Sequence, residues 1–311
     1  MTVAIVLLGI ALVGLLGHRP LLWLAGRRVD PTVLLTGWVL SSVGLVVATV
    51  ASVALLAVPP HEHRPHGVFR LAGDCLAAIS DGSVPGGQEA LATLGVAATT
   101  GALARLAWVV RVRLRARRER APHLAQLRLL ARQAPPDEPL WIRDDRPLAM
   151  SVGGRPGVIV LSDTLRRDLT PAAVAATLEH ERAHLRGRHH LLTAVTQALA
   201  SAFPVCPLLR HAPSAIEDLV ELAADARAAR HCGPAAVHEA LYQLAGQSAP
   251  ALGLAMAGRL VHERLARLDA GTVGSRPMAR AAGCVAVATA AMLLPVAAGL
   301  SALDVIGCFV A

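Results

Sequence analysis

The sequence predicts a mainly α-helical membrane protein, in which four transmembrane helices carry one α+β domain. Of its 311 residues, 54% are hydrophobic, and the mean hydropathy is +0.51. Only 17% are charged, against about 25% in an ordinary soluble domain. Several apolar stretches reach the roughly 20 residues that a helix needs to cross a hydrocarbon core about 30 Å thick. The composition also excludes a disordered chain, which would be apolar-poor and highly charged.

Four stretches have the length and composition of transmembrane helices: residues 2–24, 32–58, 90–110 and 279–300. The first has no basic residue in its first ten positions, whereas a cleavable signal peptide usually begins with a basic region. We therefore expect a retained helix there. The spans divide the chain into a three-helix region, a domain, and a last helix with a short tail, over residues 1–110, 111–278 and 279–311.

The placement of arginine predicts the orientation of these helices. All thirty basic residues are arginine, and the side of a membrane richer in arginine is normally cytoplasmic. Arginines crowd the segments that follow the first and third spans and precede the fourth, whereas the 59–84 loop carries only Arg64 and Arg70. We expect this loop outside a bacterial plasma membrane and the 111–278 domain in the cytoplasm.

The arginine run over residues 111–120 has two interpretations. It resembles a nucleic-acid-binding patch in charge, but it directly follows a predicted membrane span. A basic segment in that place is better explained as a topology anchor at anionic lipid headgroups. We therefore expect the lipid bilayer as its partner and no direct binding of nucleic acid.

Local signals in the domain predict a β-hairpin followed by a capped helix. Leu148–Val152 and Val158–Leu161 flank a glycine-rich turn, a pattern typical of a hairpin. Thr170 is a natural N-cap and Pro171 fits the first helical position. A helix should therefore run from there to about Arg186 and stop at the glycine that follows.

The predicted helix carries the HExxH pattern as His180-Glu181-Arg182-Ala183-His184. Residues four apart share one face of a helix, so His180 and His184 can hold one Zn²⁺ ion. Glu181 then lies beside the open coordination position, where it can take a proton from water as a general base. The pattern on a capped helix therefore indicates zinc-dependent hydrolysis of peptide bonds.

A catalytic zinc ion needs a third protein ligand, and the sequence offers two. His190 completes HExxHxxGxxH, the metzincin pattern, in which Gly187 would turn the chain so that a third histidine reaches back. The other choice is Glu221 on a later helix. We prefer Glu221 and keep His190 as the alternative ligand.

The helix that carries Glu221 is predicted over residues 215–231. Ser214 and Glu217 form a capping box at its start, and a glycine followed by a proline supplies its stop. Asp225 lies one turn beyond Glu221 on the same face. This spacing suits a carboxylate that ligates the metal and a second one that orients a ligand histidine.

Three segments of the domain together carry a family resemblance. They are Val158-Ile159-Val160-Leu161-Ser162, Leu178-Glu179-His180-Glu181-Arg182-Ala183-His184-Leu185 and Glu221-Leu222-Ala223-Ala224-Asp225-Ala226. The combination resembles the membrane-embedded gluzincin peptidases of the BlaR/MecR type, the β-lactam-sensing transducers. HtpX-type and prenyl-protein (CAAX) endopeptidases share the HExxH and ExxAD elements. The resemblance covers about residues 120–270 and the arrangement of three spans before the domain and one after it.

The resemblance implies a zincin-like (gluzincin) fold and a zinc-dependent endopeptidase. It makes His180, His184 and Glu221 the zinc ligands and Glu181 the catalytic base. It also assigns Asp225 to a supporting position behind the ligands. Arg264 resembles a family arginine late in the domain, for which we expect a structural or supporting role.

The resemblance also implies a class of substrate. Transducers of this type act through regulated cleavage of a transcriptional repressor, so we expect a protein or peptide substrate at the cytoplasmic membrane face. HtpX-like quality control of membrane proteins is the alternative among enzymes. The alternative of a different class is a non-catalytic signal transducer that contains a zinc-bound domain.

Residues 191–209 separate the two motif helices and constrain the geometry. They are free of charge and largely apolar, so their length alone fits a further span. A single crossing would put His184 and Glu221 on opposite sides of the membrane. If Glu221 is a ligand, this stretch must be buried, re-entrant or interfacial, and we expect a helix lying against the membrane face.

Two further sets of residues have predicted roles in substrate handling. Zinc peptidases commonly add an extended substrate to an edge strand beside the motif helix. Leu148–Val152, especially Ala149 and Met150, is the expected edge strand. Arg227 and His231 are candidates for stabilising the oxyanion, because they follow Glu221 on its helix.

Overall fold

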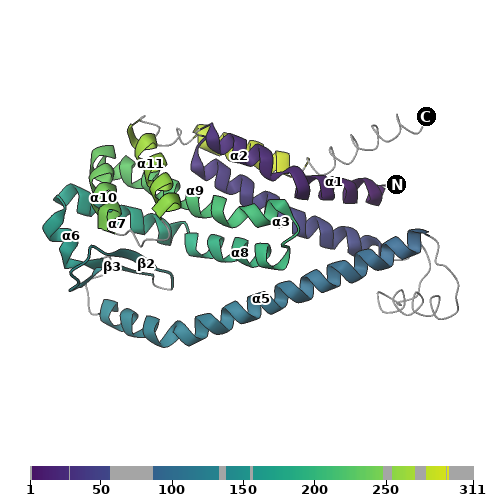
Figure 1. Cartoon of the computed structure of the whole chain (residues 1–311), viewed down its shortest axis with the longest axis horizontal. Coiled ribbons are helices and arrows are strands. Elements are labelled where there is room, and N and C mark those ends of the chain that lie inside the picture. The colour runs from purple at the N-terminus through teal and green to yellow at the C-terminus, as the bar shows by residue number, and fades with distance from the viewer. Residues whose placement is uncertain are drawn as a thin grey trace.

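The computed structural model is mostly helical, with a small three-stranded sheet at one end of an elongated helical body (Figure 1). The predicted fold class is confirmed at this level, as a mainly helical chain with one small sheet. The structure describes residues 2–27, 29–56, 87–132, 138–154, 157–247, 254–269, 278–291 and 293.

The N-terminal region is a bundle of apolar helices: α1 (Thr2–Leu16), α2 (His18–Gly26) and α3 (Pro31–Leu56). Two of its stretches, Gly9–Gly26 and Pro31–Ala51, are long and apolar enough to cross a membrane. They overlap the predicted spans 2–24 and 32–58. Two apolar N-terminal segments are therefore candidate spans by length and composition.

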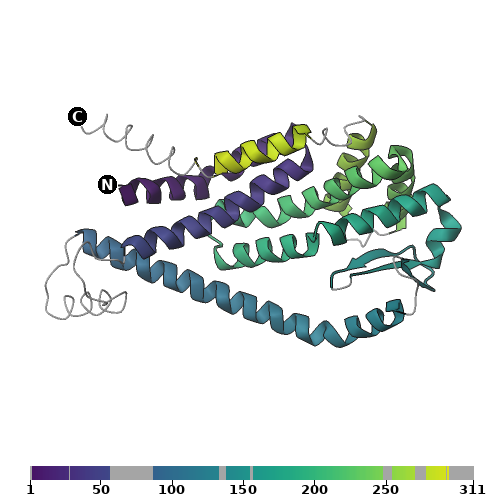
Figure 2. The ribbon, with the colours of Figure 1, turned by 180° about the vertical axis from the view of Figure 1, so that it is seen from behind.

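The third and fourth predicted spans are not confirmed. Residues 90–110 lie inside α5 (Gly87–Arg132), a single helix of 46 residues that continues through the arginine-rich segment. Helix Met278–Ala291 is apolar but shorter than a span, and it packs along α3 (Figure 2). The predicted outer loop 59–84 and most of the C-terminal tail fall outside the described residues.

The predicted hairpin is confirmed, and a third strand joins it. β2 (Ala149–Val152) pairs antiparallel with β3 (Val158–Ser162), with Met150 opposite Val160. β1 (Leu140–Ile142) pairs parallel with the other side of β3. The strand order β1-β3-β2 leaves β2 at an edge of the described sheet.

The motif helix forms as the local signals predict. After the short α6 (Asp163–Asp168), α7 runs over Pro171–Arg186, with its proline in the first turn and Gly187 at its C-cap. Thr170 is the N-cap, and its hydroxyl accepts a hydrogen bond from the amide of Ala173 at 3.3 Å. A hydroxyl in this place satisfies one of the free amides at a helix start.

The second motif helix begins earlier than predicted. α9 spans Pro207–Cys232 rather than residues 215–231, so Ser214 lies inside the helix and the predicted capping box does not form. The Ser214 hydroxyl donates to the carbonyl of His211 instead. The first part of α9 is helical because its apolar face is buried against α1 and α3. The buried side chains of this face are Leu208, Leu209, Ala212 and Ile216. Tertiary packing therefore outweighs the local capping signal.

Residues 191–209 form no single straight span. α8 (His189–Ala202) ends before a turn at 203–206, and α9 then begins at Pro207. The two helices pack against each other as a hairpin, which returns the chain toward α7. This hairpin brings the second motif helix back beside the first.

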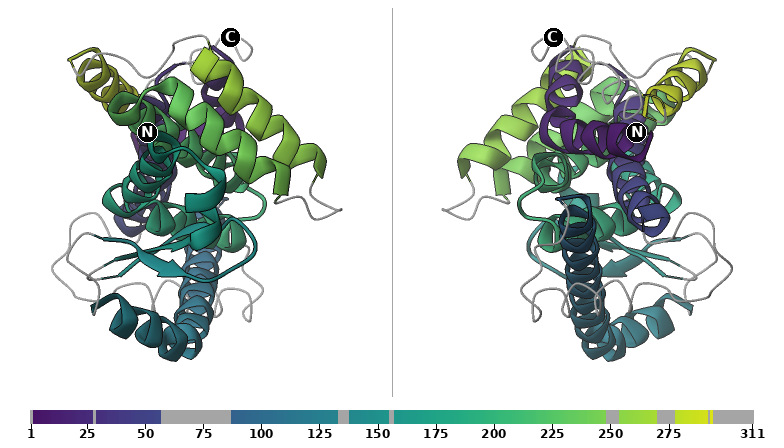
Figure 3. Two further views of the ribbon diagram at one scale, coloured as in Figure 1. Left: turned by 90° about the vertical axis from the view of Figure 1, so that its left-hand side faces the viewer. Right: turned by 90° about the vertical axis from the view of Figure 1, so that its right-hand side faces the viewer.

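The remaining helices, α10 (Pro234–Gln247) and α11 (Leu254–Asp269), cover α7 and the end of α9. Figure 3 gives the end views, in which the sheet lies between α5 and the α10–α11 pair. Ala176 of α7 packs with Ala228 and Ala229 of α9 in a buried cluster. These small side chains let the two motif helices approach closely.

Candidate metal centre

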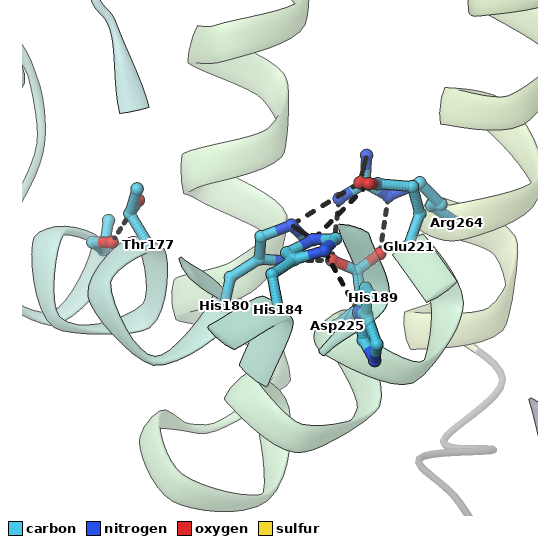
Figure 4. Close-up of polar contacts among 8 residues, drawn as sticks. Thr177, His180, His184, His189, Glu221, Asp225 and Arg264 are labelled. Atoms are coloured by element: carbon cyan, nitrogen blue, oxygen red, sulfur yellow. Dashed lines mark hydrogen bonds and ion pairs between the residues drawn. The ribbon is translucent and has the colours of Figure 1, made fainter. Parts of the chain in front are cut away.

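α7 presents His180 and His184 toward α9, where Glu221 faces them (Figure 4). The Nε2 atoms of the two histidines lie 3.0 Å apart. Glu221 Oε2 lies 3.5 Å from His180 Nε2, and Glu221 Oε1 lies 3.4 Å from His184 Nε2. Two imidazoles and one carboxylate from two helices therefore converge on one point.

The donor set fits a zinc ion. In a tetrahedral site with Zn–N distances of about 2.0–2.1 Å, neighbouring ligand atoms are about 3.3 Å apart. The three distances above, 3.0 to 3.5 Å, lie around this value. Within the described residues, His180, His184 and Glu221 form the one group of three metal-binding side chains, with ligand atoms within 4.8 Å of one another.

Asp225 and Arg264 support the cluster from behind. Asp225 Oδ1 accepts a hydrogen bond from His180 Nδ1 at 2.9 Å. Arg264, on α11, donates to both oxygens of Asp225, from Nε to Oδ2 at 2.6 Å and from Nη2 to Oδ1 at 2.8 Å. Its Nη1 also lies 3.2 Å from Glu221 Oε2. One arginine therefore contacts both carboxylates that face His180, those of Glu221 and Asp225.

The sequence pattern of peptidase family M48 matches residues 123–298. The match covers more than half of the chain and includes all of the residues described in this site. The chain belongs to peptidase family M48. This membership implies metalloprotease activity and protein substrates, whereas the BlaR/MecR subtype is not confirmed by it. No curated protein and no solved structure matches this M48 chain.

Charges at the site of this M48 peptidase are set by burial and by these contacts. Burial alone would lower the pKa of His180, but hydrogen bonds to Asp225 and Glu221 raise it to about 9. Burial would raise the pKa of Glu221, but the hydrogen bond from His180 and the charges of His180 and Arg264 lower it to about 2. Burial lowers the pKa of His184 to about 4, helped by the charge of His180. His184 is therefore neutral at neutral pH, and Glu221 is ionised.

Glu181 lies at the same site and lines the smaller of two cavities that reach the cluster. Its side chain is buried, and this burial raises the pKa of its carboxyl group. A cavity of about 320 Å³ is lined by His180, Glu181 and Glu221 together with residues of β2, α10 and α11. A larger one of about 880 Å³ reaches His184, Glu221 and Ser151 from the side of α5 and α8. The cluster is thus open to both.

His190, the alternative ligand, is not part of the cluster. The side chain of His190 is exposed. Its ring lies against Gly153 in the turn between β2 and β3, so that a Cβ added at Gly153 would be 2.5 Å from Nε2 of His190. Arg227 and His231 line neither of the two cavities beside the cluster. His231 is exposed and its Nδ1 lies 2.9 Å from the carbonyl of Arg227.

The neighbouring His189 is a residue of the site that the sequence did not reveal. It is buried, and its Nδ1 lies 3.0 Å from Nδ1 of His184. Burial lowers its pKa to about 4. The glycine at 187 was the available signal, because an added Cβ there would lie 2.3 Å from the His189 ring. The pattern HxxGxxH predicts the next residue, His190, as the ligand instead.

Proposed function

We propose that this chain is a zinc metalloendopeptidase of a bacterial plasma membrane that cleaves proteins at the cytoplasmic membrane face. His180, His184 and Glu221 hold the zinc ion, Glu181 is the general base, and Asp225 orients His180. The observation that carries the proposal is the convergence of three donor atoms within 4.8 Å beside a buried glutamate.

Each side chain has a defined task in this proposal. Bound Zn²⁺ would lower the pKa of a water molecule to about 7 and polarise the carbonyl of the scissile peptide bond. Glu181 takes the proton from the attacking water and passes it to the leaving amine. Its buried carboxyl group has a raised pKa, which brings its proton affinity closer to that of the groups with which it exchanges the proton. Asp225 holds the proton on Nδ1 of His180, so that Nε2 keeps its lone pair for the metal.

The edge strand β2 supports the binding of an extended substrate. β2 contacts α7, the helix that carries the HExxH pattern. The outer edge of β2 has no partner strand among the described residues. Met150 is 41% exposed there, and Ser151 reaches the Glu181 carboxylate with its hydroxyl. A substrate that adds to β2 by backbone hydrogen bonds would pass directly over Glu181.

The position of the α8–α9 hairpin supports a membrane location. At its tip, Cys206 contacts α1, with Sγ 3.5 Å from the carbonyl of Gly14. Leu208 and Leu209 pack in one buried cluster with Trp38 and Leu45 of α3. The tip of the hairpin therefore lies alongside both candidate spans. The metal-binding cluster lies at the opposite end of α8, where His189 contacts His184. A reporter fused after residue 270 should be active in the cytoplasm, and activity outside the cell would refute the orientation.

We further propose a transcriptional repressor as the regulated substrate, on the strength of the resemblance to BlaR/MecR-type transducers. Proteomic comparison of cells carrying the wild-type chain and its Glu181→Gln variant tests this. A repressor that accumulates intact in the variant supports the proposal. Accumulation of damaged membrane proteins alone would favour quality control.

Glu181→Gln is the decisive variant for catalysis. It should keep its zinc and lose peptide hydrolysis by about 10²–10⁴-fold, because general-base catalysis is worth that much. Glu179→Gln is the matched control, since Glu179 lies on the same helix but pairs with Arg182 and Arg186. The control should keep both zinc and activity. Unchanged cellular function in a zinc-loaded Glu181→Gln protein would favour a non-catalytic transducer.

A further inference from the structure

The turn between α7 and α8 is built around the ring of His189. Gly187 ends α7, and the His189 ring fills the space that a side chain at 187 would occupy. Arg188 then adopts a left-handed backbone with φ 49°, the one non-glycine residue with positive φ among those described. A left-handed arginine is strained. The chain therefore accepts an unfavourable backbone and needs a glycine in order to fold His189 back toward α7.

The folded-back ring meets one of the proposed zinc ligands. His189 Nδ1 lies 3.0 Å from His184 Nδ1, and the two rings meet edge to face with their centroids 4.8 Å apart. His189 is 8% exposed, so water does not compete freely for this contact. Nε2 of His184, on the other side of its ring, faces His180 and Glu221.

The arrangement decides where the proton of His184 resides when a metal is bound. Ligation through Nε2 requires the lone pair of that nitrogen, so the proton of a neutral His184 must be on Nδ1. There it needs an acceptor, and Nδ1 of His189 lies at hydrogen-bond distance. His189 can accept because its own proton can reside on Nε2.

We propose that His189 is a positioning residue that accepts the Nδ1 proton of His184 and thereby aims Nε2 of His184 at the metal. The inference rests on the proposed function, because it takes His184 as a zinc ligand. It gives the two histidines matched supports: Asp225 accepts from Nδ1 of His180, and His189 accepts from Nδ1 of His184. Partners of this kind fix the tautomer and the ring orientation of a ligand histidine.

The proposal is tested by the zinc affinity of the full-length metal-free protein, measured by competition with a chelator. His189→Leu keeps a side chain of similar size but removes the acceptor nitrogen. His189→Asn places an amide oxygen near the position of Nδ1. His238→Leu is the matched control, because His238 lies on α10 away from the cluster, beside Asp269. Thermal unfolding of each metal-free variant verifies that it is folded.

His189→Leu should bind zinc about 10–100-fold more weakly than the wild-type protein, the usual cost of losing an outer partner of a ligand. His189→Asn should recover most of the affinity, and His238→Leu should retain all of it. Wild-type affinity in His189→Leu overturns the proposal, as does equal weakening in the Leu and Asn variants. Failure of the wild-type protein itself to bind zinc would instead refute the proposed metal site, and this inference with it.

Discussion

Zinc binding to the metal-free protein should release close to one proton at pH 6, and Asp225→Asn should lower the pH at which zinc affinity levels off. His180 is the source of the proton. Its Nδ1 contacts Asp225 at 2.9 Å and its Nε2 contacts Glu221 at 3.5 Å, and these carboxylates hold its pKa at about 9 against the opposing effect of burial. The zinc ion needs the lone pair of Nε2, so the imidazolium must lose a proton before it can bind.

The expected magnitude follows from the pKa values. At pH 6, a group with a pKa of about 9 is more than about 99% protonated, and displacing its proton costs about 1.4 kcal/mol for each pH unit below the pKa. Because the pKa is raised, zinc affinity should increase about tenfold per pH unit and level off above pH 9. Glu221 and His184, with pKa values of about 2 and 4, contribute almost no proton at pH 6. Asparagine at 225 carries no charge, so the pKa of His180 should fall, and zinc affinity should level off at a lower pH than in the wild-type protein.

Calorimetric titration of zinc into the metal-free protein, in two buffers of different ionisation enthalpy, counts the protons released. At pH 6 a zinc-bound water with a pKa of about 7 stays mostly protonated and adds little. Asp218→Asn is the control, because Asp218 is an exposed carboxylate on the same helix. Absence of proton release by the wild-type protein would contradict the assignment of His180 as the proton source. The same titrations from pH 6 to pH 9 give the zinc affinity, and a plateau at the same pH in the wild-type and Asp225→Asn proteins would also contradict it.

Two further substitutions test the supports around the site by unfolding of the metal-free protein in detergent. Thr170→Ala removes the hydroxyl that caps α7 and donates to Glu239 at 2.7 Å; it should cost about 1 kcal/mol, whereas Thr170→Ser should cost less, and equal losses would contradict the capping role. Arg264→Ala removes the bidentate partner of the buried Asp225 carboxylate. The free energy of unfolding should fall by about 3–5 kcal/mol, as for a broken buried ion pair. The stability of Arg264→Lys should lie between those of the wild-type and Arg264→Ala proteins, because lysine keeps the charge but cannot make the bidentate contact. An unchanged unfolding midpoint in Arg264→Ala would contradict a supporting role for Arg264.

The parts of the site that the sequence predicts are those decided within a few residues. The start and end of α7 follow from Thr170, Pro171 and Gly187, and the structure confirms each. The convergence of His180 and His184 is equally local, because a four-residue spacing on a helix fixes it. The hairpin β2–β3 also follows from its strand pattern and glycine-rich turn.

Features decided by distant contacts were missed. The early start of α9 depends on burial of its first two turns against α1 and α3. The residues around Ser214 give no local indication of this packing. Between His189 and His190, the backbone of Arg188 determines which ring returns to the site. A one-residue difference at such a turn cannot be read from the spacing of glycine and histidine. β1 was missed because three residues are too few for a recognisable pattern.

The zinc content of the purified protein directly tests whether His180, His184 and Glu221 hold one zinc ion. We expect one zinc ion per wild-type chain, its loss in Glu221→Ala, and its retention in His190→Ala, because Glu221 and not His190 joins His180 and His184 in the cluster. Retention of zinc in Glu221→Ala together with its loss in His190→Ala would contradict Glu221 as the third ligand and favour a site of three histidines.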